Sequence, residues 1–72
     1  MDQEKIGRFI AERRRKLGLT QKQLAEPLHV TDKTVSKWET GVRLPDAAML
    51  PELSSVLKTD INELLAGEAF LA

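Results

Sequence analysis

The 72-residue sequence contains no cysteine and no tyrosine, and it has one tryptophan and one histidine. Without cysteine there can be no disulfide and no thiolate metal site, and one histidine alone cannot build a metal centre. No apolar run approaches the roughly 18 residues of a membrane helix. Charges interrupt the apolar residues of "MDQEKIGRFIAERRRK", which is unlike a secretory signal. We therefore expect a cytoplasmic protein with no metal and no cofactor.

Patterns that support catalysis are also missing. No nucleophile–base pair, glycine-rich phosphate loop or carboxylate dyad can be assembled, so we predict that the protein is no enzyme. The length suits one domain over residues 1–72. Leu, Ala, Glu, Lys and Arg dominate the composition. Small domains without disulfides or metals usually depend on tightly packed helices, and we predict a compact all-α fold.

The formal net charge is zero, but the charges are unevenly distributed. Residues 1–43 carry ten Lys or Arg and six Asp or Glu, a balance of 10 − 6 = +4. Residues 44–72 carry one Lys and five acids, a balance of 1 − 5 = −4. A chain polarised in this way can present a basic face to a polyanion. A plain solubility pattern is the alternative, and the asymmetry alone does not decide between them.

The first predicted helix runs from Gln3 to Leu17 and ends at Gly18. Its apolar residues recur at helical spacing and define one buried face, made of Ile6, Phe9, Ile10 and Leu17. Arg13 falls on the same face. We expect its stem to pack against the core while its guanidinium reaches water.

Two short helices follow at about residues 20–40. Thr20 and Gln23 have the spacing of a capping box at the start of the first. Pro27 cannot donate a backbone hydrogen bond and should keep that helix short. Thr31 is then expected to cap a helix that continues to about Glu39 or Thr40.

Two further helices are predicted in the second half of the chain. Asp46 is expected to cap a helix that reaches about Leu57, with either a kink at Pro51 or a start nearer Met49. Asp60 and Glu63 form another capping box, which predicts a helix over residues 61–66. Two apolar residues of the tail, Phe70 and Leu71, have no obvious place in this scheme.

The two middle helices divide into a buried face and a polar face. The apolar positions should join them at a sharp angle around a small Ala25; they are Leu24, Ala25, Leu28, Val30, Val35 and Trp38. Trp38 could be a stacking platform for a base, but its three-residue spacing from Val35 favours the core. The opposite face of the second of these helices carries Asp32, Lys33, Ser36 and Lys37, with Thr34 beside them. A protruding helix of this kind suits the major groove of DNA.

The stretch "GLTQKQLAEPLHVTDKTVSKWETG" resembles the helix-turn-helix of lambda-repressor-like regulators, the Cro or XRE family. The resemblance extends over "FIAERRRKLGLTQ" before it and "LPDAAMLPELSSVLKTDINELLAGE" after it, and so covers nearly the whole chain. It implies a fold of five helices. The second helix would lie across the DNA backbone and the third in the major groove.

The resemblance also implies which residues contact DNA. Phosphate contacts fall to Gln21, Thr31 and Arg43, and base contacts to Asp32, Lys33 and Lys37 with support from Thr34. For Asp32 two roles stay open. Its carboxylate can accept a hydrogen bond from cytosine N4, or it can favour the positive N-terminus of the helix.

Internal roles follow from the same resemblance. Arg14 and Glu39 match a pair that forms a salt bridge between the first and third helices. The "RRRK" run at 13–16 could be a nucleic-acid patch, but on a helix its four side chains point in different directions. We therefore interpret it as a mostly solvated face, with Arg14 taken by Glu39. His29 occupies a turn position where the family usually has Gly or Asn, and Lys58 follows the fourth helix where Gly is common. A turn role is the expected one for His29.

The predicted function is a sequence-specific transcription regulator, a repressor that binds a palindromic site as a homodimer on double-stranded DNA. The rival hypothesis is an antitoxin-like or scaffold module that binds another protein through the same fold. The near-neutral charge favours this rival slightly. The polar, Lys-bearing third helix opposes it, because a protein-docking face should expose more apolar area.

Overall fold

The computed structural model describes residues 2–70. These residues form five α-helices and two single 3-10 turns, with no strand among them, which confirms the predicted all-α fold. The helices are α1 (Gln3–Lys16), α2 (Gln21–Ala25), α3 (Asp32–Glu39), α4 (Leu50–Val56) and α5 (Ile61–Ala66). The 3-10 turns η1 (Glu26–Leu28) and η2 (Ala47–Met49) precede α3 and α4.

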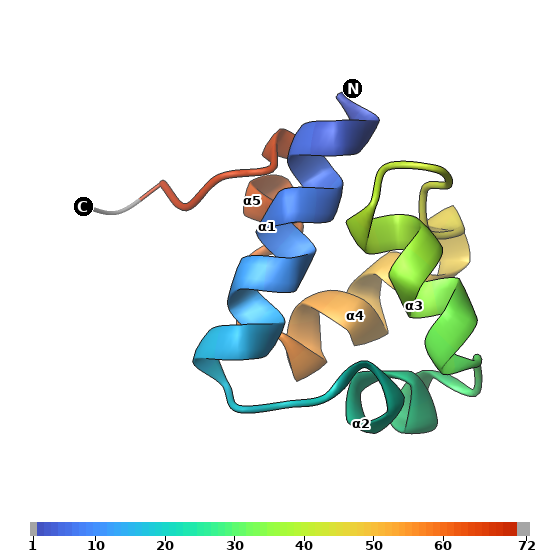
Figure 1. Cartoon of the computed structure of the whole chain (residues 1–72). Coiled ribbons are helices and arrows are strands. Elements are labelled where there is room, and N and C mark those ends of the chain that lie inside the picture. Colours follow the sequence, from blue (N-terminus) through green and yellow to red (C-terminus); the bar gives the residue numbers. More distant parts are fainter. Residues whose placement is uncertain (1, 71–72) are drawn as a thin grey trace.

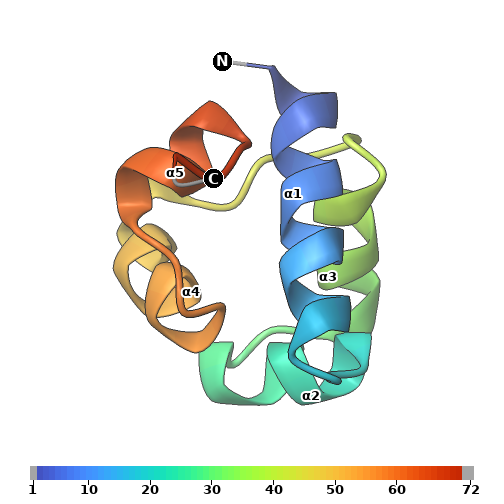
Figure 2. The same cartoon turned by 90° about the vertical axis from the view of Figure 1, so that its left-hand side faces the viewer.

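Helices α1 and α3 run side by side on one flank of the molecule, and α2 crosses below them (Figure 1). Figure 2 shows α4 and α5 on the opposite flank. The close approach of α1 to α3 depends on Gly7. A Cβ added there would lie 2.2 Å from the carbonyl oxygen of Trp38 and 2.9 Å from that of Glu39. The backbones of the two helices therefore touch at this point.

One hydrophobic core joins all five helices. It contains Ile6, Phe9, Ile10, Leu24, Ala25, Leu28, Val35, Trp38, Leu53, Leu57 and Leu64. Trp38 is 3% exposed, so its ring belongs to the core and is no platform for a base. Leu17 and Val30 pack against the core from its edge, partly buried.

Most helix ends follow the predicted capping residues. The capping boxes at Thr20 and Asp60 are both confirmed, and the Thr31 hydroxyl accepts from the Thr34 amide at 3.2 Å. The expected cap at Asp46 is wrong, because its side chain accepts no capping hydrogen bond and α4 begins only at Leu50. Pro51 therefore lies in the first turn of α4, where its missing N–H is not needed. Of the two alternatives for this helix, the start nearer Met49 is confirmed.

The expectation for Arg13 is incomplete. Its guanidinium also has protein partners: it donates to the carbonyl oxygen of Leu57, from Nε at 3.1 Å and from Nη2 at 2.9 Å. Nη2 also donates to the Lys58 carbonyl at 3.1 Å. Carbonyls at a helix end have no partner within their helix, and the planar guanidinium supplies several donors at once. Arg13 therefore ties α1 to the end of α4.

The tail after α5 is held by Glu63. One carboxylate oxygen accepts from the Phe70 amide at 2.8 Å, and the other accepts from the Asp60 amide and the Thr59 hydroxyl, both at 3.0 Å. These hydrogen bonds, the one from Phe70 first, lower the pKa of Glu63 below its ordinary value of 4.5. The Phe70 side chain remains 59% exposed, and Leu71 lies outside the described residues.

Candidate nucleic-acid interface

The junction between α2 and α3 is a tight turn. Pro27 lies in η1, so the chain tightens from α2 into a 3-10 turn instead of extending the helix. His29 then adopts the left-handed conformation with φ 56°, as expected at the turn position. The Val30 amide donates back to the Ala25 carbonyl at 3.3 Å. Ala25 is 2% exposed and lets the two helices pack closely.

Helix α3 presents a polar face to solvent. Asp32, Lys33 and Lys37 are exposed, while Thr34 is half-buried. Lys33 and Lys37 are one helical turn apart and therefore neighbours on this face. The carboxylate of Asp32 accepts from the Lys33 amide at 2.9 Å, an interaction that suits the role at the helix N-terminus. Asp32 is nevertheless exposed, so the base-reading role stays open too.

The hydroxyls of Thr31, which precedes α3, and Thr34, which lies in it, are hydrogen-bonded to each other. Besides its cap on the Thr34 amide, Thr31 Oγ1 lies 3.1 Å from Thr34 Oγ1. Thr31 is exposed and remains accessible at the edge of the helix. The two threonines thus stiffen the first turn of α3.

Arg14 and Glu39 form the pair that the resemblance implied. Arg14 Nε lies 2.6 Å from Glu39 Oε2, and Nη2 lies 3.0 Å from Oε1. The two side chains are only 12% and 5% exposed. Arg14 Nη1 also donates to the Leu19 carbonyl at 2.8 Å. One bidentate pair therefore joins α1, the α1–α2 connection and α3.

Gln21 has an internal partner that sequence reasoning missed. Its Nε2 donates to Glu39 Oε1 at 3.0 Å, so the carboxylate of Glu39 accepts three hydrogen bonds in all. Gln21 is half-buried at the start of α2. The sequence analysis paired Glu39 with Arg14 and gave no reason to add Gln21 as a further donor to the same carboxylate. The structure thus attaches the start of α2 to the end of α3.

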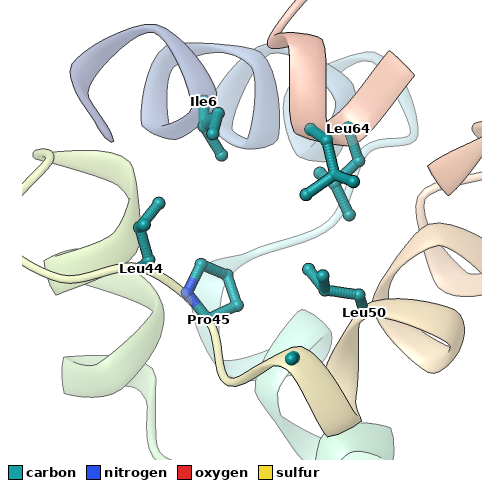
Figure 3. Close-up of a pocket in the computed structure, with 7 residues that line it drawn as sticks. Ile6, Leu44, Pro45, Leu50 and Leu64 are labelled. Atoms are coloured by element: carbon teal, nitrogen blue, oxygen red, sulfur yellow. The ribbon is translucent and has the colours of Figure 1, made fainter. Parts of the chain in front are cut away.

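The loop after α3 carries Arg43, which is exposed. The amides of Val42 and Arg43 both donate to the Lys37 carbonyl, at 3.0 and 3.2 Å, and hold the loop against the end of α3. Farther on, Leu44 and Pro45 line a small apolar pocket of about 80 Å³ (Figure 3). Its other walls include Ile6 of α1, Leu50 of α4 and Leu64 of α5. Leu44 also packs against the edge of the core, so the loop is held on both sides of Arg43.

Other kinds of site find little support in residues 2–70. No helix among them is long and apolar enough to cross a membrane. Nor do three or more His, Asp or Glu side chains gather there as a metal site would require. The polar face of α3 and its neighbouring side chains are therefore the surface to compare with known proteins.

A family model described as helix-turn-helix matches residues 10–64, a span that contains α2, the left-handed turn and α3. The chain belongs to the Cro/XRE-type helix-turn-helix family. This membership confirms the resemblance drawn from the sequence. It also agrees with the prediction that the protein is no enzyme.

Three curated proteins are similar to this helix-turn-helix chain. The HTH-type transcriptional activator BcrR of Enterococcus faecalis is 43% identical over 53 residues, which are 74% of this chain and 26% of BcrR. The HTH-type transcriptional regulator ImmR of Bacillus subtilis (strain 168) is 35% identical over 83% of this chain and 47% of its own length. The HTH-type transcriptional regulator DicA of Escherichia coli (strain K12) is 38% identical over 88% and 47%. The chain thus spans between about a quarter and a half of the length of these relatives.

Proposed function

We propose that this helix-turn-helix protein is a sequence-specific DNA-binding regulator of transcription that places α3 in the major groove. The observation that carries the proposal is the face of α3. Lys33 and Lys37 project from it one turn apart, while Val35 and Trp38 on the other side are buried. Lysine can donate to guanine O6 and N7 in the major groove. The names of the three relatives, all transcriptional regulators, support the same function.

The other residues of this surface take positioning roles in the proposal. Gln21, Thr31 and Arg43 contact phosphates and fix the register of the protein on the duplex, which carries no sequence information by itself. Thr34 supports the first turn of α3. Asp32 either accepts from cytosine N4 or keeps that end of the helix away from phosphates by charge repulsion. Base recognition then falls mainly to Lys33, with Lys37 shared between base and backbone.

We further propose that the protein acts in the cytoplasm as a repressor and binds a palindromic site as a homodimer. One domain of this size reaches few base pairs. Two copies on half-sites about one helical turn apart multiply the specificity. Residues 1–72 form the single DNA-binding domain in this proposal, with the helix-turn-helix at about 20–40. One relative is named an activator, so the sign of regulation is tested separately with a reporter gene.

The rival function is docking to another protein, as an antitoxin-like or scaffold module. Such a face normally presents a contiguous apolar patch. The large apolar side chains exposed among the described residues are Val42, Ile61 and Phe70, which lie on three different segments, none of them on α3. The polar character of α3 therefore favours DNA.

The test begins with selection of bound duplexes from a random-sequence pool, followed by affinity measurements on the selected site and its single-base variants. Lys33→Ala should weaken binding to the selected site by about 1–3 kcal/mol and relax the preference at one symmetric pair of positions. Arg43→Ala should weaken binding to all duplexes alike. Stability should barely change in either variant, because both side chains are exposed.

Each outcome has a defined meaning. A uniform loss over all single-base variants would make Lys33 a phosphate contact. If Lys33→Ala bound every duplex as tightly as wild type, α3 would not enter the groove. Binding that ignored salt would then favour a protein partner, because contacts with DNA phosphates weaken steeply as salt rises.

A further inference from the structure

We propose that Arg8 and Arg15 of α1 form a second contact with the DNA sugar–phosphate backbone, in a groove beside α3. This inference rests on the proposed DNA-binding function and extends it to a helix outside the helix-turn-helix. The ligand is the phosphodiester strand that borders the major groove occupied by α3.

The groove lies between three helices and has a volume of about 300 Å³. Arg8, Glu12 and Arg15 line it from α1, Gln21 from the start of α2, and Thr40 from the end of α3. Positions 8, 12 and 15 are separated by four and three residues, so they share one face of α1. Arg8 and Arg15 are two helical turns apart, about 10 Å along the axis. Their side chains can therefore reach different phosphates of one strand.

The groove is next to the exposed face of α3 that carries Lys33 and Lys37, which we call the reading stripe. Thr40 follows Lys33 and Lys37 at spacings of seven and three residues, so it continues the same stripe of α3. That stripe ends at the rim of the groove, since Thr40 lines it. The end of α3 lies next to α1, because the backbone at Gly7 closely approaches the carbonyls of Trp38 and Glu39. Figure 1 shows the two helices nearest to each other at that end of α3. A duplex seated on the reading stripe thus brings one of its strands over this rim and towards α1.

The charges suit an anion that arrives from solution. Arg8 and Arg15 are both exposed. The nearest carboxylate to Arg8 is Glu4 at 4.0 Å, and with side chains 64% and 78% exposed this pair is weak and easily exchanged for a phosphate. Glu39 also lines the groove, but its charge is already paired with Arg14. Among the described residues that line the groove, Glu12 is then the one carboxylate without an ion-pair partner.

The three arginines of the "RRRK" run have different surroundings in the structure. Arg13 is taken up by the end of α4 and Arg14 by Glu39. Arg15 reaches the groove instead and has no carboxylate within 4.0 Å among residues 2–70. Two of its neighbours are thus structural, and Arg15 keeps its charge available for a ligand.

The test compares Arg8→Gln, Arg15→Gln and the double variant with Lys5→Gln. Lys5 also belongs to α1, but its ammonium lies 3.4 Å from Glu68 on the α5 side, away from the groove. Affinity is measured by fluorescence anisotropy at about 50 and about 200 mM salt, on the selected duplex and on a random-sequence duplex of the same length. Each phosphate contact contributes about 0.9 to the slope of log affinity against log salt, or roughly a threefold loss over this range.

We expect each single variant to lose about threefold less affinity than wild type between the two salt concentrations, and the double variant about tenfold less. Both duplexes should respond equally, because a phosphate carries no sequence information. Glu12→Gln should bind DNA more tightly than wild type, since it removes a repulsive charge from the groove. Lys5→Gln should keep the wild-type salt dependence.

Failure of this inference is separable from failure of the proposed function. If wild-type protein binds DNA with a steep salt dependence, while the arginine variants and Glu12→Gln behave like Lys5→Gln, the groove is no backbone site although the protein binds DNA. If wild-type protein binds neither duplex at low salt, the proposed function itself is wrong. Loss of affinity on the selected duplex alone would make the arginines base-reading residues and would also overturn the inference.

Discussion

The substitution Glu39→Ala tests the interaction that joins the helix-turn-helix to the rest of the fold. In the wild type the Glu39 carboxylate is 5% exposed and accepts from Arg14 Nε, Arg14 Nη2 and Gln21 Nε2. Alanine removes all three acceptor contacts at once. Arg14 keeps its bond to the Leu19 carbonyl, but its charge remains largely buried without a counter-charge.

The magnitude follows from the burial of that stranded charge. Removal of one partner of a buried pair typically costs about 3–5 kcal/mol. Arg14 is 12% exposed and regains some hydration, so we expect a loss near the lower limit, about 3 kcal/mol. For a domain of this size that corresponds to a fall in Tm of roughly 12–24 °C. The total stability of 72 residues is about 4–11 kcal/mol, so the variant should be marginal but partly folded at 25 °C.

Circular dichroism during heating and during urea titration measures the loss. The double variant Arg14→Met/Glu39→Leu is the control, because an apolar replacement of both partners is often neutral or stabilising. It should therefore be more stable than Glu39→Ala. A loss below about 1 kcal/mol in Glu39→Ala would refute the reasoning and make the pair no stronger than a surface ion pair. A double variant as unstable as Glu39→Ala would show that the loss comes from packing and not from the stranded charge.

Two further predictions concern backbone packing and pH. Gly7→Ala should destabilise the fold by about 3 kcal/mol, since its Cβ would collide with the Trp38 carbonyl. Gly18→Ala, which meets no atom within 4 Å but has φ +72°, should cost only about 1 kcal/mol in the same urea titration. Because the folded-state pKa of Glu63 is lowered, its stabilising contribution is present above the ordinary value of 4.5 and is lost as pH falls below 4.5 through the folded-state pKa. The stability difference between wild type and Glu63→Gln should accordingly shrink on acidification, and a difference independent of pH would contradict the assignment to Glu63.

Local signals in the sequence were sufficient for most of the fold. Capping boxes and glycines act over three or four residues, so Thr20 and Asp60 could be assigned without knowledge of their neighbours in space. Side-chain partners remote in sequence could not be assigned in this way. Arg13 finds its acceptors 44 and 45 residues away, at the end of a helix whose direction the sequence does not reveal. Asp46 has a residue type that often caps helices, but here a 3-10 turn precedes α4.

Only part of the candidate site could be predicted from local patterns in the sequence. The polar stripe of α3 follows from helical periodicity alone, and Lys33 and Lys37 are exposed as expected. The role of Arg14 depended on the family resemblance, since no local rule pairs residues 25 positions apart. The hydrogen bond from Gln21 to Glu39 and the groove beside Arg15 depend on the tertiary arrangement and could not be predicted from the sequence. They arise where three helices meet, and a periodic pattern describes only one helix at a time.

Helix α3 has one face that stabilises the fold and another that is exposed to solvent, and this explains how α2 and α3 can be so short. Helices of five and eight residues are too short to be stable alone in water, so α2 and α3 depend on tertiary contacts. Those contacts come from buried Val35 and Trp38 and from Glu39, all directed towards the rest of the protein. The outer face of α3 contributes little to stability. Substitutions at Lys33 or Lys37 can therefore change DNA recognition at little cost to folding, whereas a change at Glu39 alters the fold first and recognition only as a consequence.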